Sequence, residues 1–279
     1  MTETLARPAP HAPLRTRDFA LFDAHLHIVD PRFPLVANQG FVPAPFDVDD
    51  YARRMAGYRL VGGAVVAGSF QGFKQHWLAD ALRHLGPSFV GVANLGAGAT
   101  DAEILTLDAL GVRAVRFNLQ RGGSENVDAL DRLARRVHEL AGWHVEIYAD
   151  AARLAPIAAT IAALPAVSVD HLGLTWSGLS LLLRLVERGV RVKASGFGRV
   201  DFDVRRALRD LSSANPDAPM FGTDLPSTRA PLPYADQDFA LVADALGERQ
   251  AAKVFSTNAL AWYGCRALED REVLSAPGT

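Results

Sequence analysis

An apolar segment near the start of the chain contains DAHLH at residues 23–27, in which two histidines are separated by one residue. If that segment is a β-strand, His25 and His27 lie on the same face of it, about 6.6 Å apart at roughly 3.3 Å per residue. Two imidazoles at that spacing can bind one ligand or one metal ion. They can equally be two polar residues at a strand end, so the pair alone does not define a site.

Two later apolar segments also end in groups that can do chemistry. VDHLG places His171 after one of them, and FGTDLP places Asp224 after another. Each has an ordinary structural alternative, His171 as a hydrogen-bonded core histidine and Asp224 as a helix cap. Together with His25 and His27 they form a set of three imidazoles and one carboxylate, which suits general-base hydrolysis or divalent-metal binding. We therefore interpret the four residues as one catalytic group.

Basic residues also lie within the apolar segments, at Arg116 and Lys193, or in the loops after them, at Arg121 and Arg199. Because guanidinium binds carboxylate in a two-point geometry, these residues predict a small anionic substrate that carries a carboxylate. Arg229 is interpreted instead as solvated surface charge. The whole chain has 29 Lys and Arg against 31 Asp and Glu, a formal net charge of −2. That balance argues against nucleic acid or an anionic membrane as a partner.

The segments that carry these residues belong to a regular alternation along the 279-residue chain. Eight short stretches rich in β-branched or aromatic residues are each followed by a longer amphipathic stretch. This alternation predicts parallel βαβ units, and eight units predict an α/β fold, a (β/α)8 TIM barrel in a single domain. A doubly wound open sheet is the alternative, but no Gly-rich phosphate loop follows the first stretch. The expected strands are residues 20–28, 63–69, 89–95, 112–118, 144–149, 167–172, 190–195 and 220–225.

A barrel of this kind brings the polar residues together, because the carboxyl ends of its strands meet at one mouth. We expect the barrel to cover residues 19–265, with a flexible leader over 1–18 and a tail over 266–279. Two final helices, over 237–246 and 251–263, are expected to pack outside the ring. The single cysteine, Cys265, and the lack of an apolar signal segment or membrane-spanning run predict a cytoplasmic protein. A homo-oligomer is compatible with these features.

The motifs together resemble a known family over about residues 20–265. HxH in DAHLHI, DHLG and GTDLPS resemble the amidohydrolase superfamily, in particular its lactone hydrolases of the amidohydrolase-2 type. VRFN at 115–118, Tyr148 and VKASGFGR at 192–199 make the chain similar to the 2-pyrone-4,6-dicarboxylate lactonases and related sugar lactonases. The resemblance implies carboxylate binding by Arg116 and Arg199. It also implies a substrate-contacting tyrosine where this chain has Phe41, so the exact substrate is not carried over.

The expected reaction is hydrolysis of a small carboxylate-bearing lactone. Asp224 would accept a proton from the attacking water. His25, His27 and His171 would polarise the ring carbonyl and stabilise the developing oxyanion. Tyr148 would donate a hydrogen bond to a substrate oxygen.

The need for a metal is left open by the sequence. Many amidohydrolases use further ligands on the fourth and fifth strands that this chain lacks, and the resembling lactonases work without a required metal. We therefore expect no required cofactor, or one divalent ion, most readily Zn2+, held by His25, His27, Glu146 and Asp224. Two other functions are kept as alternatives: a metal-dependent nonoxidative decarboxylase of an aromatic or unsaturated acid, and a non-catalytic carboxylate-binding barrel.

Overall fold

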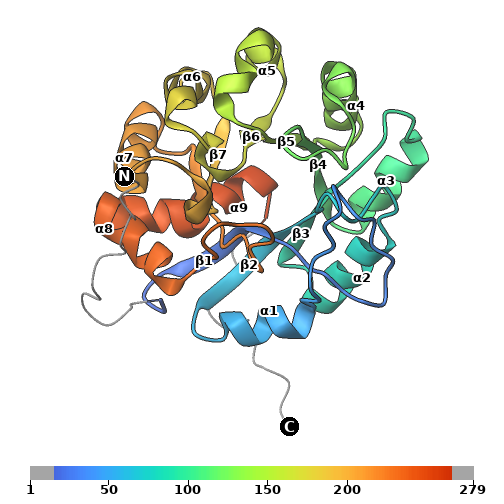
Figure 1. Ribbon diagram of the computed structural model, residues 1–279, viewed down its shortest axis with the longest axis horizontal. Coiled ribbons are helices and arrows are strands. Elements are labelled where there is room, and N and C mark those ends of the chain that lie inside the picture. The colour runs from blue at the N-terminus through green and yellow to red at the C-terminus, as the bar shows by residue number, and fades with distance from the viewer. Residues whose placement is uncertain (1–15, 266–279) are drawn as a thin grey trace.

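A ring of eight parallel strands forms the centre of the molecule in the computed structural model, which describes residues 16–265. Each strand pairs with the next along the chain, from β1 to β8, and helices surround them (Figure 1). The predicted (β/α)8 barrel is confirmed. The predicted leader over 1–18 lies outside the described residues apart from residues 16–18, and the tail over 266–279 lies outside them entirely.

The elements alternate as the hydrophobic pattern predicts, and the strands are short. The strands are β1 (Ala20–Leu26), β2 (Arg59–Val66), β3 (Phe89–Ala93), β4 (Val112–Asn118), β5 (His144–Tyr148), β6 (Val167–Val169), β7 (Arg191–Ala194) and β8 (Pro219–Phe221). The helices are α1 (Val48–Met55), α2 (His76–Leu85), α3 (Asp101–Ala109), α4 (Leu130–Ala141), α5 (Ala158–Ala163), α6 (Trp176–Val186), α7 (Val204–Ala214), α8 (Asp236–Ala252) and α9 (Asn258–Tyr263). Several predicted strands extend beyond the observed ones, because their last residues belong to the loops that form the mouth.

Two apolar layers hold the ring together. The larger one lies between the outward faces of the strands and the surrounding helices. The smaller one fills the barrel interior with side chains such as Phe22, Val92 and Met220. It also includes Ala259 and Tyr263 of α9.

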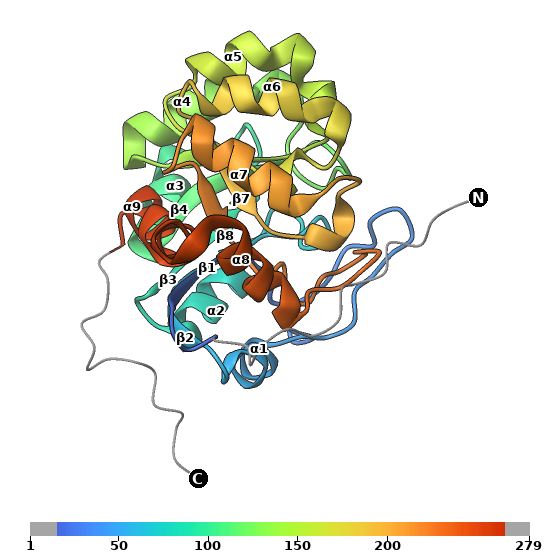
Figure 2. The ribbon, with the colours of Figure 1, turned by 90° about the vertical axis from the view of Figure 1, so that its left-hand side faces the viewer.

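The position of α9 differs from the prediction that both final helices pack outside the ring. Figure 1 shows α9 inside the circle of outer helices, and Figure 2 shows it on the opposite side of the barrel from the long loops. Tyr263 stacks on Phe22, with ring centroids 5.6 Å apart. A π-helical turn over Lys253–Thr257 joins α8 to α9. The last helix therefore closes the amino-terminal end of the barrel.

The strand ends of β1 and β8 meet through backbone hydrogen bonds. The Asp224 N–H donates to His25 O at 2.7 Å, and the His27 N–H donates to Leu225 O at 2.8 Å. Gly222 allows this approach, because a Cβ at that position would lie 2.6 Å from the His25 nitrogen. The junction places the first and last catalytic candidates side by side.

Two long loops extend together over the mouth of the barrel (Figure 2). One follows β1 over residues 27–47, and the other follows β8 over residues 222–235. They are joined by Arg229, whose guanidinium donates to Asn38 Oδ1 at 3.0 Å.

Among residues 16–265, no helix combines the length and apolarity that crossing a bilayer requires.

Candidate active site

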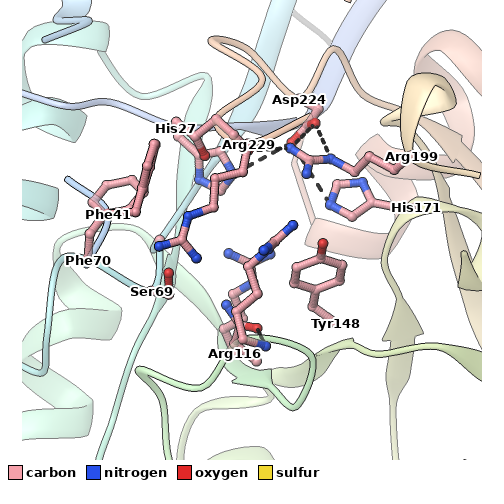
Figure 3. A pocket seen from close by; sticks show the side chains of 14 residues that line it. His27, Phe41, Ser69, Phe70, Arg116, Tyr148, His171, Arg199, Asp224 and Arg229 are labelled. Carbon is pink, nitrogen blue, oxygen red and sulfur yellow. Dashed lines mark hydrogen bonds and ion pairs between the residues drawn. The ribbon is translucent and has the colours of Figure 1, made fainter. Parts of the chain in front are cut away.

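One oxygen of Asp224 lies at the centre of three imidazoles, two of which, His27 and His171, are drawn beside it in Figure 3. Asp224 Oδ1 is 3.7 Å from His27 Nε2 and 3.9 Å from Nε2 of both His25 and His171. All four side chains are almost fully buried. The structure therefore brings the four predicted catalytic residues together at the mouth, from β1 and from the loops after β1, β6 and β8.

Neighbouring strands fix the orientation of the imidazoles. His27 Nδ1 lies 2.7 Å from Val66 O, so this nitrogen carries a hydrogen and donates it. His171 Nδ1 lies 3.0 Å from Ser195 Oγ. Gly196 permits that packing, since a Cβ there would lie 2.7 Å from His171 Nδ1. In both rings Nε2 is left to face the centre.

The backbone is strained where it presents two of these residues. His171 has φ 51° and Asp224 has φ 60°, in the left-handed region that non-glycine residues rarely adopt. Each such residue typically costs about 1–3 kcal/mol and persists where the surroundings hold it. The unusual backbone conformation at both positions directs the His171 and Asp224 side chains towards each other.

A buried ion pair fixes the other oxygen of the Asp224 carboxylate. Arg199 Nε donates to Oδ2 at 2.7 Å, and Arg199 Nη2 donates to Thr228 O at 2.8 Å. Burial alone would raise the pKa of Asp224, but the Arg199 guanidinium and the imidazoles hold that pKa well below its usual range. Asp224 is therefore ionised at neutral pH, and Oδ1 has no hydrogen-bond partner among the described residues.

Burial acts on the imidazoles in the opposite sense. It lowers the pKa of His25 well below the ordinary 6.5, and Lys193 lowers it further. It also lowers the pKa of His171 to about 4, despite the nearby Asp224. Both rings are neutral at pH 7, so each has one N–H and one lone pair.

The lowered pKa of His171 predicts a loss of stability in mild acid. Between pH 6.5 and about 4 the unfolded ring takes up a proton that the folded ring does not, so stability falls as the pH falls. Between pH 7 and pH 5 the free energy of unfolding should fall by about 2 kcal/mol because of His171. Denaturant titrations of chelator-treated protein at the two pH values measure the loss. The His171→Leu variant should lose less over the same range, and an equal loss would contradict the assignment.

A small pocket of about 30 Å³ opens above this centre. Its wall is basic and partly aromatic. His27, His171 and Asp224 are part of the wall, whereas His25 lies below it. The lining residues are His27, Phe41, Gly68, Ser69, Phe70, Arg116, Asn118, Arg121, Tyr148, His171, Arg199, Asp224, Thr228 and Arg229. Four guanidinium groups thus face a pocket in which Asp224 is the single carboxylate of the described lining.

The four arginines differ in their partners. Arg199 pairs with Asp224, and Arg116 Nη2 donates to Asp170 Oδ2 at 2.9 Å. The guanidiniums of Arg121 and Arg229 make no ion pair within residues 16–265, and burial and then the nearby Arg121 charge lower the pKa of Arg229. Two uncompensated cations therefore remain on the side of the pocket beneath the long loops.

The interpretation of Arg229 as solvated surface charge is wrong. Its guanidinium lies in the pocket wall, 4.3 Å from the centre of the Phe41 ring, and is bonded to Asn38. Asp170 also belongs to the VDHLG motif, but the motif alone does not indicate its partner. Its contact with Arg116 joins the loop after β6 to β4, which only the barrel geometry reveals.

Tyr148 and Lys193, both expected to bind substrate, are placed differently from each other. Tyr148 lines the pocket, with its ring centroid 4.9 Å from that of His171. Lys193 does not line it and lies deeper, where its Nζ contacts Glu146 Oε2 at 2.5 Å. Glu146 is fully buried in this deeper layer and accepts a second bond from Tyr263 at 2.5 Å.

Two groups of residues have the donors to hold a divalent ion. His25, His171 and Asp224 form one, and His25, Glu146 and Asp170 form the other, with the ligand atoms of each within 4.8 Å. Tetrahedral zinc ligands at about 2.0–2.2 Å lie roughly 3.4 Å apart, close to the spacing in the first group. His25 Nε2 and Asp224 Oδ1 are both buried without a hydrogen-bond partner in the described residues, so the first group fits a metal. The set differs from the predicted one, because His171 takes the place of His27 and Glu146 belongs to the deeper group.

Comparison with known proteins supports the predicted resemblance. A curated 2-pyrone-4,6-dicarboxylate hydrolase of Comamonas testosteroni is 31% identical over 156 residues, which are 54% of this chain and 51% of that protein. The chain thus spans about half the length of the curated relative it matches.

Solved structures show the same fold at lower identity. A protein of Acinetobacter baumannii described as a probable 2-pyrone-4,6-dicarboxylic acid hydrolase, with citric acid bound, is 18% identical with TM-score 0.77, over 88% of this chain and 99% of that one. A Pseudomonas putida protein named for the same activity is 24% identical with TM-score 0.74, over 88% and 97%. A protein of Agrobacterium tumefaciens is 19% identical with TM-score 0.79, over 92% and 100%. The amidohydrolase family model itself matches residues 22–265, nearly the whole described chain, and the protein therefore belongs to the amidohydrolase family.

Proposed function

We propose that this protein is a hydrolase that opens a small carboxylate-bearing lactone. The observation that carries the proposal is an ionised, partnerless Asp224 Oδ1 facing three imidazoles at the base of an arginine-lined pocket. The names of the relatives support the same class of reaction. A carboxylate ligand, citric acid, in the Acinetobacter baumannii structure agrees with the basic pocket.

The uncompensated cations indicate how the substrate is held. A substrate carboxylate placed against Arg121 and Arg229 would neutralise charge that the described residues leave unpaired. Arg116 and Arg199 already have carboxylate partners, so they contribute by shaping the pocket and fixing Asp170 and Asp224. The lactone carbonyl would then lie over the imidazoles.

The residues at the centre can divide the chemistry among them. Because His27 Nδ1 donates to Val66 O, its Nε2 can accept a hydrogen bond from the attacking water. Asp224 Oδ1 takes the proton of that water as its oxygen bonds to the carbonyl carbon. His25 and His171 stabilise the oxyanion through Nε2–H groups. The ring C–O bond then breaks, and the proton on Asp224 passes to the departing ring oxygen.

A divalent ion fits His25, His171 and Asp224. When bound, such an ion supplies Lewis-acid polarisation of the carbonyl and lowers the pKa of water. Asp224 would still be held by Arg199 through its second oxygen.

A screen of carboxylated lactones tests the function. Proton release should accompany ring opening without release of carbon dioxide, in assays run with and without chelator. Carbon dioxide release from an unsaturated acid, with no lactone opened, would favour the decarboxylase instead. Binding of carboxylates without turnover in either assay would favour the non-catalytic barrel.

The carboxylate contact predicts a selective effect of Arg121→Gln. A hydrogen bond to a charged group is worth about 1.5–3 kcal/mol, so KM for a carboxylated lactone should rise at least about tenfold. The kcat should change little, because the contact is made in the ground state and the transition state alike. Steady-state kinetics measure both constants. The control is Arg135→Gln on α4, which removes an exposed arginine paired with Asp131; equal KM values for the two variants would contradict the contact.

A further inference from the structure

A buried ion pair lies directly beneath the catalytic centre and has no part in the reaction steps above. Lys193 Nζ is 2.5 Å from Glu146 Oε2, and both side chains are fully buried. The same ammonium lies 3.5 Å from His25 Nδ1 in hydrogen-bonding geometry. The pair therefore contacts the one catalytic imidazole that does not line the pocket.

Lys193 and Asp170 both lie near His25 Nδ1 and favour opposite protonation states of that nitrogen. Lys193 has only N–H donors, so a ring nitrogen that faces it must be an acceptor. Asp170 Oδ1 lies 3.6 Å from the same nitrogen but makes no hydrogen bond, and it is left without a partner in the described chain. Asp170 is instead engaged by Arg116 through its other oxygen. The contacts favour Nδ1 as the lone-pair nitrogen.

We propose that Lys193 is a positioning residue that fixes His25 in the tautomer with its proton on Nε2. With the lone pair on Nδ1 facing the ammonium, the ring hydrogen of His25 is on Nε2. That nitrogen faces Asp224 Oδ1 at 3.9 Å and has no hydrogen-bond partner among the described residues. A substrate oxygen at the centre would receive its N–H. Lys193 thus acts through His25, without touching the substrate.

The charges of the deeper layer support this role. Glu146 and Asp170 are buried carboxylates, and the two cations that face them are Lys193 and Arg116. The ammonium is therefore paired with Glu146 and lies near enough to Asp170 to affect its charge, so it lies among the residues of the deeper candidate group. A metal at His25 Nε2 would first have to displace the proton that Lys193 places there.

Nitrogen-15 NMR of the histidine rings tests the tautomer directly. In chelator-treated protein at pH 7.5 (about one unit above the ordinary histidine pKa), His25 should show a protonated Nε2 and an unprotonated Nδ1. His27 is the internal reference with the reverse pattern, because its Nδ1 donates to Val66 O. If wild-type His25 has its proton on Nδ1, the proposal is wrong.

Two variants assign the effect to Lys193. Lys193→Met with Glu146→Gln removes the donor without leaving a buried charge unpaired, and His25 should then move its proton to Nδ1, towards Asp170. Glu146→Gln alone leaves Lys193 facing Nδ1 with Asp170 as its remaining nearby anion, and it should keep the wild-type tautomer. A double variant that retains the Nε2 proton would overturn the role of Lys193. If the double variant does not fold, the wild-type spectrum with its His27 reference still decides the tautomer.

The kinetic consequence rests on the proposed function. Loss of one oxyanion donor typically lowers kcat about 10²–10³-fold, so the double variant should lose about a hundredfold in kcat with little change in KM. If Lys193 only stabilised the fold, its replacement would not lower kcat while leaving KM unchanged, and it would not change the tautomer of His25. Were wild-type protein inactive on every lactone, the proposed function would fail while the NMR result still decided the tautomer.

Discussion

Replacing Asp224 with asparagine should lower kcat on a carboxylated lactone at least about a hundredfold, the usual scale for a general base. Asparagine keeps the size and can still accept from Arg199, but it cannot take a proton from water. In the wild type, Oδ1 is the atom that faces the three imidazoles and has no hydrogen-bond partner among the described residues. Steady-state kinetics measure the loss, and circular dichroism and thermal unfolding show whether the fold is retained.

The control for this substitution is Asp210→Asn on α7. Asp210 is a partly exposed carboxylate 3.7 Å from Arg206, so the variant makes the same chemical change outside the site. It should leave kcat within about twofold of wild type, because exposed ion pairs contribute little. Near-normal turnover in Asp224→Asn would remove Asp224 from the role of base. Equal losses in both variants would point to a general effect of the substitution.

The order of the elements could be predicted from the sequence because it depends on local patterns. Each strand is a short apolar run before a turn, as in β4, whose predicted and observed limits are the same, Val112–Asn118. The place of α9 could not be predicted in this way. Its apolar residues Ala259 and Tyr263 fit a helix packed outside the ring as well as one that closes it. Only the space left inside the barrel, beside Phe22, decides between them.

The proximity of the four catalytic candidates could be predicted for a different reason. HxH, DHLG and GTDLP each follow a strand, and the barrel brings all strand ends to one mouth, so exact distances were not needed. The partners of the charged residues do depend on them. Lys193 and Arg116 both lie on strands, yet Lys193 points to Glu146 below the pocket while Arg116 lines the pocket and pairs with the buried Asp170. Depth along a strand depends on register and side-chain direction, which the pattern of residue types does not contain.

The deeper layer leads to the largest expected change in stability, in Glu146→Ala. Removing one partner of a buried ion pair typically costs about 3–5 kcal/mol, because the other charge stays buried without compensation. Here Lys193 would be left, and Tyr263 and His144 would each lose a hydrogen-bond partner. Denaturant titration at pH 7 measures the unfolding free energy. Exposed Glu139→Ala on α4 is the control and should change it by no more than about 0.5 kcal/mol.

The pH dependence of the stability difference between wild type and Glu146→Ala distinguishes the effect of losing the carboxylate charge from the effect of creating a cavity. Burial alone would raise the pKa of Glu146, but Lys193 and then His144 bring that pKa down to about 2, from an ordinary value of 4.5. The carboxylate therefore stabilises the fold fully above pH 4.5, and this contribution is lost as the pH falls towards 2. Wild type and Glu146→Ala should accordingly converge in stability over that range, whereas a cavity would leave a constant difference. A gap that stays the same from pH 6 to the lowest pH at which both proteins fold would mean that packing, and not the Lys193 pair, is what Glu146 contributes.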